Sequence, residues 1–145
     1  MSPAIRVGDL TVTFHKTRHE TDGAFDLYEM TIPVGSRMFM PHFHRDYDET
    51  IMGIDGISHW VLDGRHIEIG PGEELFIKRG TVHSVVNLHQ SAARVMCLIT
   101  PGKLGPEYFQ ELAAVAYNSD QPNSANTLAD AAAVMARYGV IPVTL

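Results

Sequence analysis

The chain has 145 residues, and this length predicts one compact domain, because two hydrophobic cores of ordinary size would not fit. Hydrophobic residues make up 45% and charged residues 19%, a composition that excludes a disordered or collagen-like chain. Eleven basic against seventeen acidic residues give a formal net charge of −6. An acidic surface repels phosphate backbones and anionic lipid headgroups, so we expect neither a nucleic acid nor a membrane as partner.

The cysteine content and the first residues bear on the compartment. The single cysteine, Cys97, cannot form an internal disulfide or a thiolate metal site, so the chain does not need an oxidising compartment. Residues 1–14 lack a basic segment followed by an apolar run, and no stretch approaches the roughly 20 apolar residues of a membrane helix. We therefore expect a cytoplasmic protein.

From residue 10 to residue 100 the sequence consists of short alternating runs separated by Gly, Pro and Asp. This pattern is typical of an antiparallel barrel or sandwich. The predicted strands are 10–14, 25–32, 37–44, 49–54, 57–62, 66–69, 74–77, 83–88 and 93–99. Two Asp-Gly pairs, Asp55-Gly56 and Asp63-Gly64, predict tight hairpins, because type I′ turns need a positive φ at both central positions.

The last third of the chain changes to helical periodicity. Apolar residues at helical spacing, after a proline suited to a first turn, predict a helix over 106–117. A second helix is predicted over 127–138, with Asn126 or Ser124 as its N-cap and Gly139 as its C-terminal stop. Each helix has one apolar face, so each must pack on the strands or on a partner chain.

Three histidines and one glutamate carry the strongest chemical signal. His42 and His44 are separated by one residue in a predicted strand, and alternation places both imidazoles on the same face. Glu49 follows after four intervening residues, and His83 begins a distant predicted strand. Three neutral imidazoles and one carboxylate suit a divalent ion of Fe, Mn, Co, Ni or Zn.

The spacing of these residues resembles the two conserved motifs of the cupin superfamily, and in particular its small, single-domain, quercetin-dioxygenase-like members. The matching patterns are Gly35-(6)-His42-x-His44-(4)-Glu49-(6)-Gly56 and Gly72-(5)-Lys78-x-Gly80-(2)-His83-(3)-Asn87. Three positions depart from the family pattern: the spacing from Gly35 to His42 is one residue longer, and Lys78 and Val82 stand where the family often has proline. All three departures lie in or beside turns, and all four ligand positions of the family pattern are present.

The resemblance implies an all-β fold, a double-stranded β-helix of the jelly-roll type, here followed by two C-terminal α-helices. It also implies that His42, His44, Glu49 and His83 bind one metal ion inside the barrel. We expect the barrel to span residues 1–102 and the helical extension to span 103–145, packed on the barrel within a single domain.

The pairing across a hairpin predicts which face of its strand a further histidine, His59, occupies. If Asp55-Gly56 is a two-residue turn, residues equidistant from it pair across a hairpin. The resulting pairs are Glu49 with Leu62, Ile51 with Trp60 and Met52 with His59. Because Glu49 faces inward, His59 faces outward, and we do not expect it to be a metal ligand.

The same parity leaves Ile57 and Val61 on the outward face beside His59. An outward face this apolar predicts that a C-terminal helix or a second subunit covers it. Together with an N-terminal strand that has no obvious partner, it favours a homodimer.

Apolar residues of the inward face predict a small substrate pocket beside the metal. Met38 and Met40 share the face of His42 and His44, unless a bulge at Pro41 intervenes. The predicted pocket residues are Met38, Met40, Ile51, Trp60 and Leu62. The alternative is that the methionines simply fill the barrel. The first C-terminal helix, with Tyr108 and Phe109, either anchors itself through these rings or caps the mouth of the barrel.

These observations favour a metal-dependent enzyme of dioxygenase type that acts on a small apolar or aromatic molecule. Glu49 would have a catalytic role besides ligation, because a carboxylate can accept a proton from a bound enol or phenol. The sequence has no Gly-rich phosphate loop and no basic cluster for a polyanionic substrate. Two alternatives stay open, a redox-neutral metal-dependent isomerase or lyase, and a cupin that binds a small ligand without catalysis.

Overall fold

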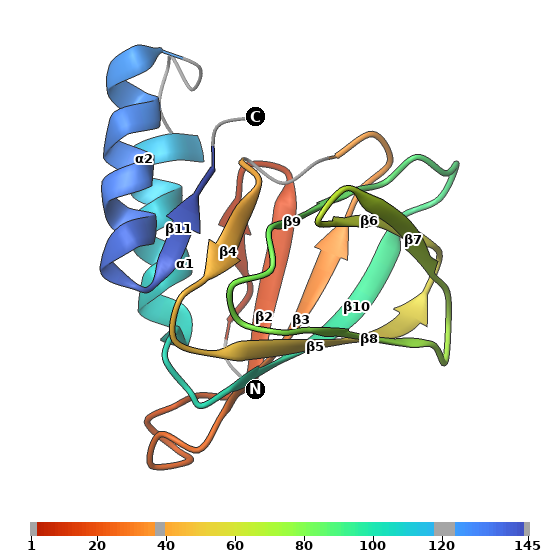
Figure 1. The fold of residues 1–145 in the computed structure, drawn as a ribbon, viewed down its shortest axis with the longest axis horizontal. Coiled ribbons are helices and arrows are strands. Elements are labelled where there is room, and N and C mark those ends of the chain that lie inside the picture. Colours follow the sequence, from red (N-terminus) through yellow and green to blue (C-terminus); the bar gives the residue numbers. More distant parts are fainter. Residues whose placement is uncertain (1–2, 37–39, 118–123, 144–145) are drawn as a thin grey trace.

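The computed structural model describes residues 3–36, 40–117 and 124–143, whose strands form two antiparallel sheets (Figure 1). The first sheet has the order β1 (Ile5–Val7), β2 (Leu10–Lys16), β3 (Asp26–Ile32), β10 (Ala93–Thr100), β5 (Asp48–Asp55) and β8 (Glu74–Ile77). The second has the order β11 (Val140–Pro142), β4 (His42–His44), β9 (His83–Val86), β6 (Ser58–Leu62) and β7 (Arg65–Ile69).

The hydrophobic core lies between the two sheets because buried and half-buried residues alternate along the strands. In β10, Ala93, Val95, Cys97 and Ile99 are buried, and each neighbour in sequence is half-exposed. The same alternation extends over all of β3. Period-two alternation, read from the sequence, thus locates most strands to within a few residues.

The pairing predicted around Asp55-Gly56 is wrong. β5 pairs with β10 and β8, whereas β6 pairs with β7 and β9, so the chain passes from one sheet to the other at this turn. Gly56 has φ 67°, and a Cβ there would lie 2.3 Å from the carbonyl oxygen of Ala92. Glu49 and Leu62 are nevertheless both buried, because the inner faces of the two sheets oppose each other.

The second Asp-Gly turn forms as predicted. Leu62 pairs with Arg65, and the two residues between them, Asp63 and Gly64, have φ 46° and 83°. Two three-residue strands, β1 and β11, were not predicted. The predicted strand 37–44 is a strand only at His42–His44, and residues 37–39 lie outside the described residues.

Two helices follow the barrel strands. α1 (Gly105–Leu112) continues into a π-helical segment, η1 (Ala113–Tyr117), and α2 spans Ala125–Arg137. The side chain of Ser124 accepts a hydrogen bond from the backbone N–H of Thr127, so Ser124 is the N-cap of α2. None of the helices in the described parts of the chain is long and apolar enough to cross a bilayer.

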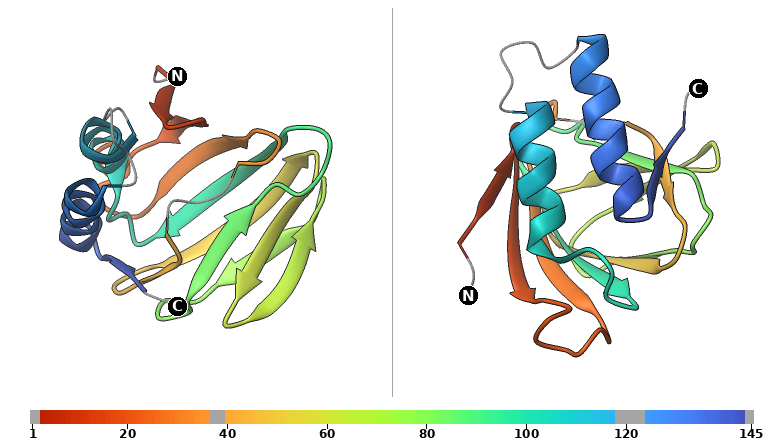
Figure 2. Two further views of the ribbon diagram at one scale, coloured as in Figure 1. Left: turned by 90° about the horizontal axis from the view of Figure 1, so that it is seen from above. Right: turned by 90° about the vertical axis from the view of Figure 1, so that its left-hand side faces the viewer.

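The helices pack at one end of the barrel, as Figure 2 shows. α1 contacts β1, α2 contacts β11, and the two helices contact each other. β6, which follows half-buried Ile57 and carries half-buried Val61, lies at the opposite end of the barrel from the helices (Figure 1). A C-terminal helix therefore does not cover its outward face, and a second subunit as its cover stays a prediction.

Candidate metal centre

Three histidines from two neighbouring strands of the second sheet converge on one point. His42 and His44 lie on β4, and His83 lies on β9 directly opposite His42. All three are buried, and their ligand nitrogens lie within 4.8 Å of one another. Alternation in β4 predicts that its two imidazoles share one face, and the family resemblance implies that His83 joins them.

Backbone carbonyls orient two of the imidazoles. His42 Nδ1 lies 3.0 Å from the carbonyl oxygen of Met40, and His83 Nδ1 lies 2.9 Å from that of Thr81. A carbonyl only accepts, so both Nδ1 atoms carry the proton and both Nε2 atoms present a lone pair. A hydrogen bond of this kind on the far nitrogen fixes the tautomer and ring orientation of a metal ligand.

The site contains buried nitrogens without a hydrogen-bond partner. Among the described residues, His83 Nε2 and His44 Nδ1 are buried and unpaired. Glu49, reaching in from β5 of the opposite sheet, places its Oε1 3.6 Å from the first and 3.7 Å from the second. Unpaired buried polar atoms are costly, and a divalent cation among them satisfies the lone pairs and the carboxylate together. The donor set therefore fits a divalent transition metal.

The electrostatics of the site keep the imidazoles of His42 and His44 neutral. Burial lowers the pKa of His42 to about 3, and the adjacent His83 contributes in the same direction. Burial, followed by the neighbouring His42 and His83, holds the pKa of His44 well below its usual range. Neutral imidazole is the form that binds a metal, so no proton has to be displaced from these rings at pH 7.

Two tyrosines that sequence reasoning missed contact the candidate ligands. The Tyr28 hydroxyl donates to Glu49 Oε2 at 3.4 Å, and burial together with the Glu49 charge raises the pKa of Tyr28. The Tyr47 ring stacks on His44, with centroids 4.7 Å apart, and its hydroxyl donates to the carbonyl of Tyr138 at the end of α2. The strand alternation predicts that Tyr28 points inward, but no sequence signal shows which ligand either tyrosine contacts.

An apolar cavity of about 70 Å³ adjoins His42, His44 and Glu49. The barrel contributes Tyr28, Met30, Met40 and Trp60 to its wall, and the C-terminal helices contribute Tyr108, Phe109, Leu112 and Met135. α1 and α2 thus close one side of the cavity.

The predicted pocket residues divide into three groups. Met40 and Trp60 line the cavity. Ile51 and Leu62 are buried in the core and do not line it. Met38 lies outside the described residues. His59 belongs to a different group of side chains, away from the three convergent histidines.

Comparison with known proteins agrees with this geometry. Residues 28–99 match the family described as Cupin domain. Quercetin 2,3-dioxygenase from Bacillus subtilis is 29% identical over 105 residues, which cover 72% of this chain and 30% of that protein. The chain thus matches less than a third of the length of this relative.

Solved structures share the fold at low sequence identity. KdgF from a Halomonas species has a TM-score of 0.61 at 18% identity, covering 69% of this chain and 86% of its own. A predicted oxalate decarboxylase from Thermotoga maritima has a TM-score of 0.61 at 18% identity, covering 68% of this chain and 90% of its own. The two-sheet barrel with C-terminal helices is therefore the predicted double-stranded β-helix, and the chain belongs to the cupin superfamily.

Proposed function

We propose that this cupin binds one divalent transition metal through His42, His44, His83 and Glu49 and is an enzyme of dioxygenase type. The observation that carries the proposal is the convergence of three imidazoles and a carboxylate, of which His42, His44 and Glu49 line an apolar cavity. The partial similarity to a quercetin 2,3-dioxygenase supports the same reaction class. When bound, such a metal supplies a Lewis acid with coordination positions left open for substrate oxygen and dioxygen.

The protein's own groups would orient the substrate and move one proton. Glu49 is the only carboxylate among the described residues that line the cavity, so it is our candidate for accepting the proton of an enol or phenol. The Tyr28 hydroxyl holds the second oxygen of this carboxylate and keeps it aimed at the histidines. The apolar wall excludes water, which strengthens the electrostatic interactions at the site.

The cavity restricts the substrate in size and charge. Its volume of about 70 Å³ is less than half of the ~150 Å³ of an engineered apolar cavity that binds benzene. A molecule smaller than benzene enters without rearrangement, whereas an aromatic substrate requires side chains of α1 or α2 to move. No lysine or arginine lines the cavity among the described residues, which disfavours a phosphorylated substrate.

The test begins with the metal. Protein purified without chelator or histidine tag should contain close to one equivalent of a transition metal per chain by elemental analysis. The His83→Ala variant should bind the metal more than about 100-fold more weakly. This loss exceeds the 10- to 100-fold effect of removing a residue that only hydrogen-bonds a ligand. His19→Ala, which removes an exposed imidazole elsewhere, is the control and should retain the metal.

Oxygen uptake then separates the reaction classes. With small enols, diketones and phenols, the metal-loaded protein should consume dioxygen, and Glu49→Gln should abolish the uptake while the fold persists. Turnover of a carbonyl substrate without oxygen would replace the dioxygenase with an isomerase or lyase. Ligand binding without any turnover would leave a binding cupin.

A further inference from the structure

A second group of side chains of the types that can bind metal ions lies on the outer face of β6 and β7. In the register of this pair, His59 stands opposite Glu68 and Val61 stands opposite His66. Alternation therefore places His59, His66 and Glu68 on one face, opposite to buried Trp60. The geometry points to a second divalent-metal site of the zinc type, formed by His59, Glu68 and His89.

The orientation of His59 carries the argument. Its Nε2 lies 2.8 Å from His66 Nδ1, while its Nδ1 is buried, has no hydrogen-bond partner and lies 3.8 Å from Glu68 Oε2. When Nε2–H donates to His66, the lone pair of Nδ1 points toward the carboxylate. A metal-ligating histidine usually has this arrangement, with one nitrogen on the ion and the other donating to an outer partner.

His89 supplies the third donor from the loop after β9. Its Nε2 contacts Glu68 Oε2, and its backbone N–H donates to Asn87 Oδ1 at 2.9 Å. The Asn87 amide in turn donates to the carbonyls of Ile32 and Ser91, at 2.9 and 2.8 Å, so the loop that carries His89 is anchored. Two imidazoles and one carboxylate, with a fourth position for water, form a common zinc ligand set.

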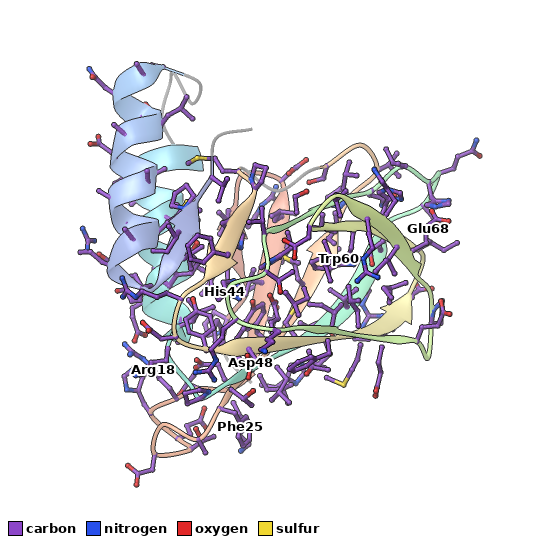
Figure 3. All side chains as sticks on the ribbon, in the orientation of Figure 1. Arg18, Phe25, His44, Asp48, Trp60 and Glu68 are labelled. Atoms are coloured by element: carbon purple, nitrogen blue, oxygen red, sulfur yellow. The ribbon has the colours of Figure 1, made fainter. Side chains whose placement is uncertain are left out.

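The carboxylate has the freedom that such a site needs. Glu68 contacts both His59 and His89, and its side chain is 50% exposed, so burial does not fix its position. Figure 3 shows Glu68 at the far side of the barrel from His44, which separates this site from the first.

Metal binding here would join three segments. β7 is an edge strand of its sheet, and the ion would link it to β6 and to the loop after β9. An ion that binds only the folded chain stabilises it by mass action. This inference does not depend on the proposed function, because it concerns different residues and requires no turnover.

The experiment is a calorimetric zinc titration of the full chain after chelator treatment, near pH 7.5. Wild type should bind two equivalents, and Glu68→Gln combined with His89→Gln should bind one. The variant with His42→Ala and His83→Ala should also bind one equivalent, held at the second site. Adding Glu68→Gln and His89→Gln to this variant should abolish zinc binding. The matched control is His19→Gln, because His19 also lies beside a glutamate, Glu107, at 2.9 Å and should leave both equivalents in place.

A further variant tests the role of His66. His66→Ala should retain the second equivalent but weaken it 10- to 100-fold, the usual effect of losing an outer-shell partner. Two equivalents in the Glu68→Gln, His89→Gln variant would overturn the proposal. A single wild-type equivalent that vanishes in His83→Ala would overturn it as well. Circular dichroism of each variant checks the fold. If the other variants unfold, the difference in zinc stoichiometry between wild type and the Glu68→Gln, His89→Gln variant still tests the proposal.

Discussion

At the scale of single residues, the hydrogen bond from Tyr28 to Glu49 links a core aromatic ring to the candidate metal centre. Tyr28 packs its ring 5.1 Å from both Phe14 and Phe109 and uses its hydroxyl on Glu49 Oε2. The ring of Tyr28 therefore packs in the core while its hydroxyl holds Glu49, and a substitution that removes only the hydroxyl tests the second role alone.

Tyr28→Phe should keep the ring packing and lose only the donor to Glu49. We expect the metal affinity to fall about 10- to 100-fold, because the carboxylate loses its outer partner. The stability of the metal-free protein should change by only about 1 kcal/mol. Competition with a chromophoric chelator measures the affinity, and chemical denaturation measures the stability. An unchanged affinity would show that Tyr28 does not position Glu49.

At the scale of elements, the C-terminal helices form part of the cavity wall. Leu112 at the end of α1 and Met135 near the end of α2 are both buried and both line the cavity. The end of α2 is further attached to the ligand strands, because Tyr47 stacks on His44 and donates to the carbonyl of Tyr138. The helices therefore determine both the size of the cavity and the packing behind one ligand.

Leu112→Ala should enlarge the cavity at the expense of stability. Truncating a buried leucine costs about 2–5 kcal/mol, with larger losses where the surroundings do not collapse. The enlarged cavity should also bind benzene, which would raise the melting temperature of the variant but not that of wild type. Leu88→Ala is the control, because Leu88 is 65% exposed and its truncation should change stability by less than about 0.5 kcal/mol. Equal stability losses in the two variants would contradict the assignment of Leu112 to the wall.

At the scale of the whole molecule, the buried imidazoles make the stability of the metal-free protein depend on pH. Folded His42 stays neutral down to about pH 3, because burial and His83 lower its pKa, whereas an unfolded histidine binds a proton below about 6.5. Between these values the unfolded state binds more protons, so stability increases with pH and is lost as the pH falls.

The metal-free protein should lose about 2 kcal/mol of unfolding free energy between pH 7 and pH 5 from His42 alone. His44, whose pKa is also lowered, contributes in the same direction. Urea denaturation at a series of pH values measures the slope, and His42→Gln should reduce it. A slope identical in the two proteins would mean that His42 is not held neutral by the fold.

The sequence predicts most of the strands and the shared face of His42 and His44 because both depend on local spacing. Alternation along a strand determines which side chains share a face, and this suffices to bring His42 and His44 together. The partner of a strand is not local: Asp55-Gly56 has the residues of a hairpin turn, yet it connects two sheets. Nor does spacing along the chain show which helix side chains close the cavity, or that Tyr47 stacks on His44.

The pairing of β11 with β4 has a consequence for biosynthesis. Val140 pairs with His44 and Pro142 with His42, so one edge of the ligand strand is covered by a segment translated long after it. Until that segment leaves the ribosome, β4 has an open edge, and open strand edges promote association between chains. The candidate metal centre is thus among the last parts of the fold to be completed, and we expect any metal to be loaded only after residues 140–142 have been released.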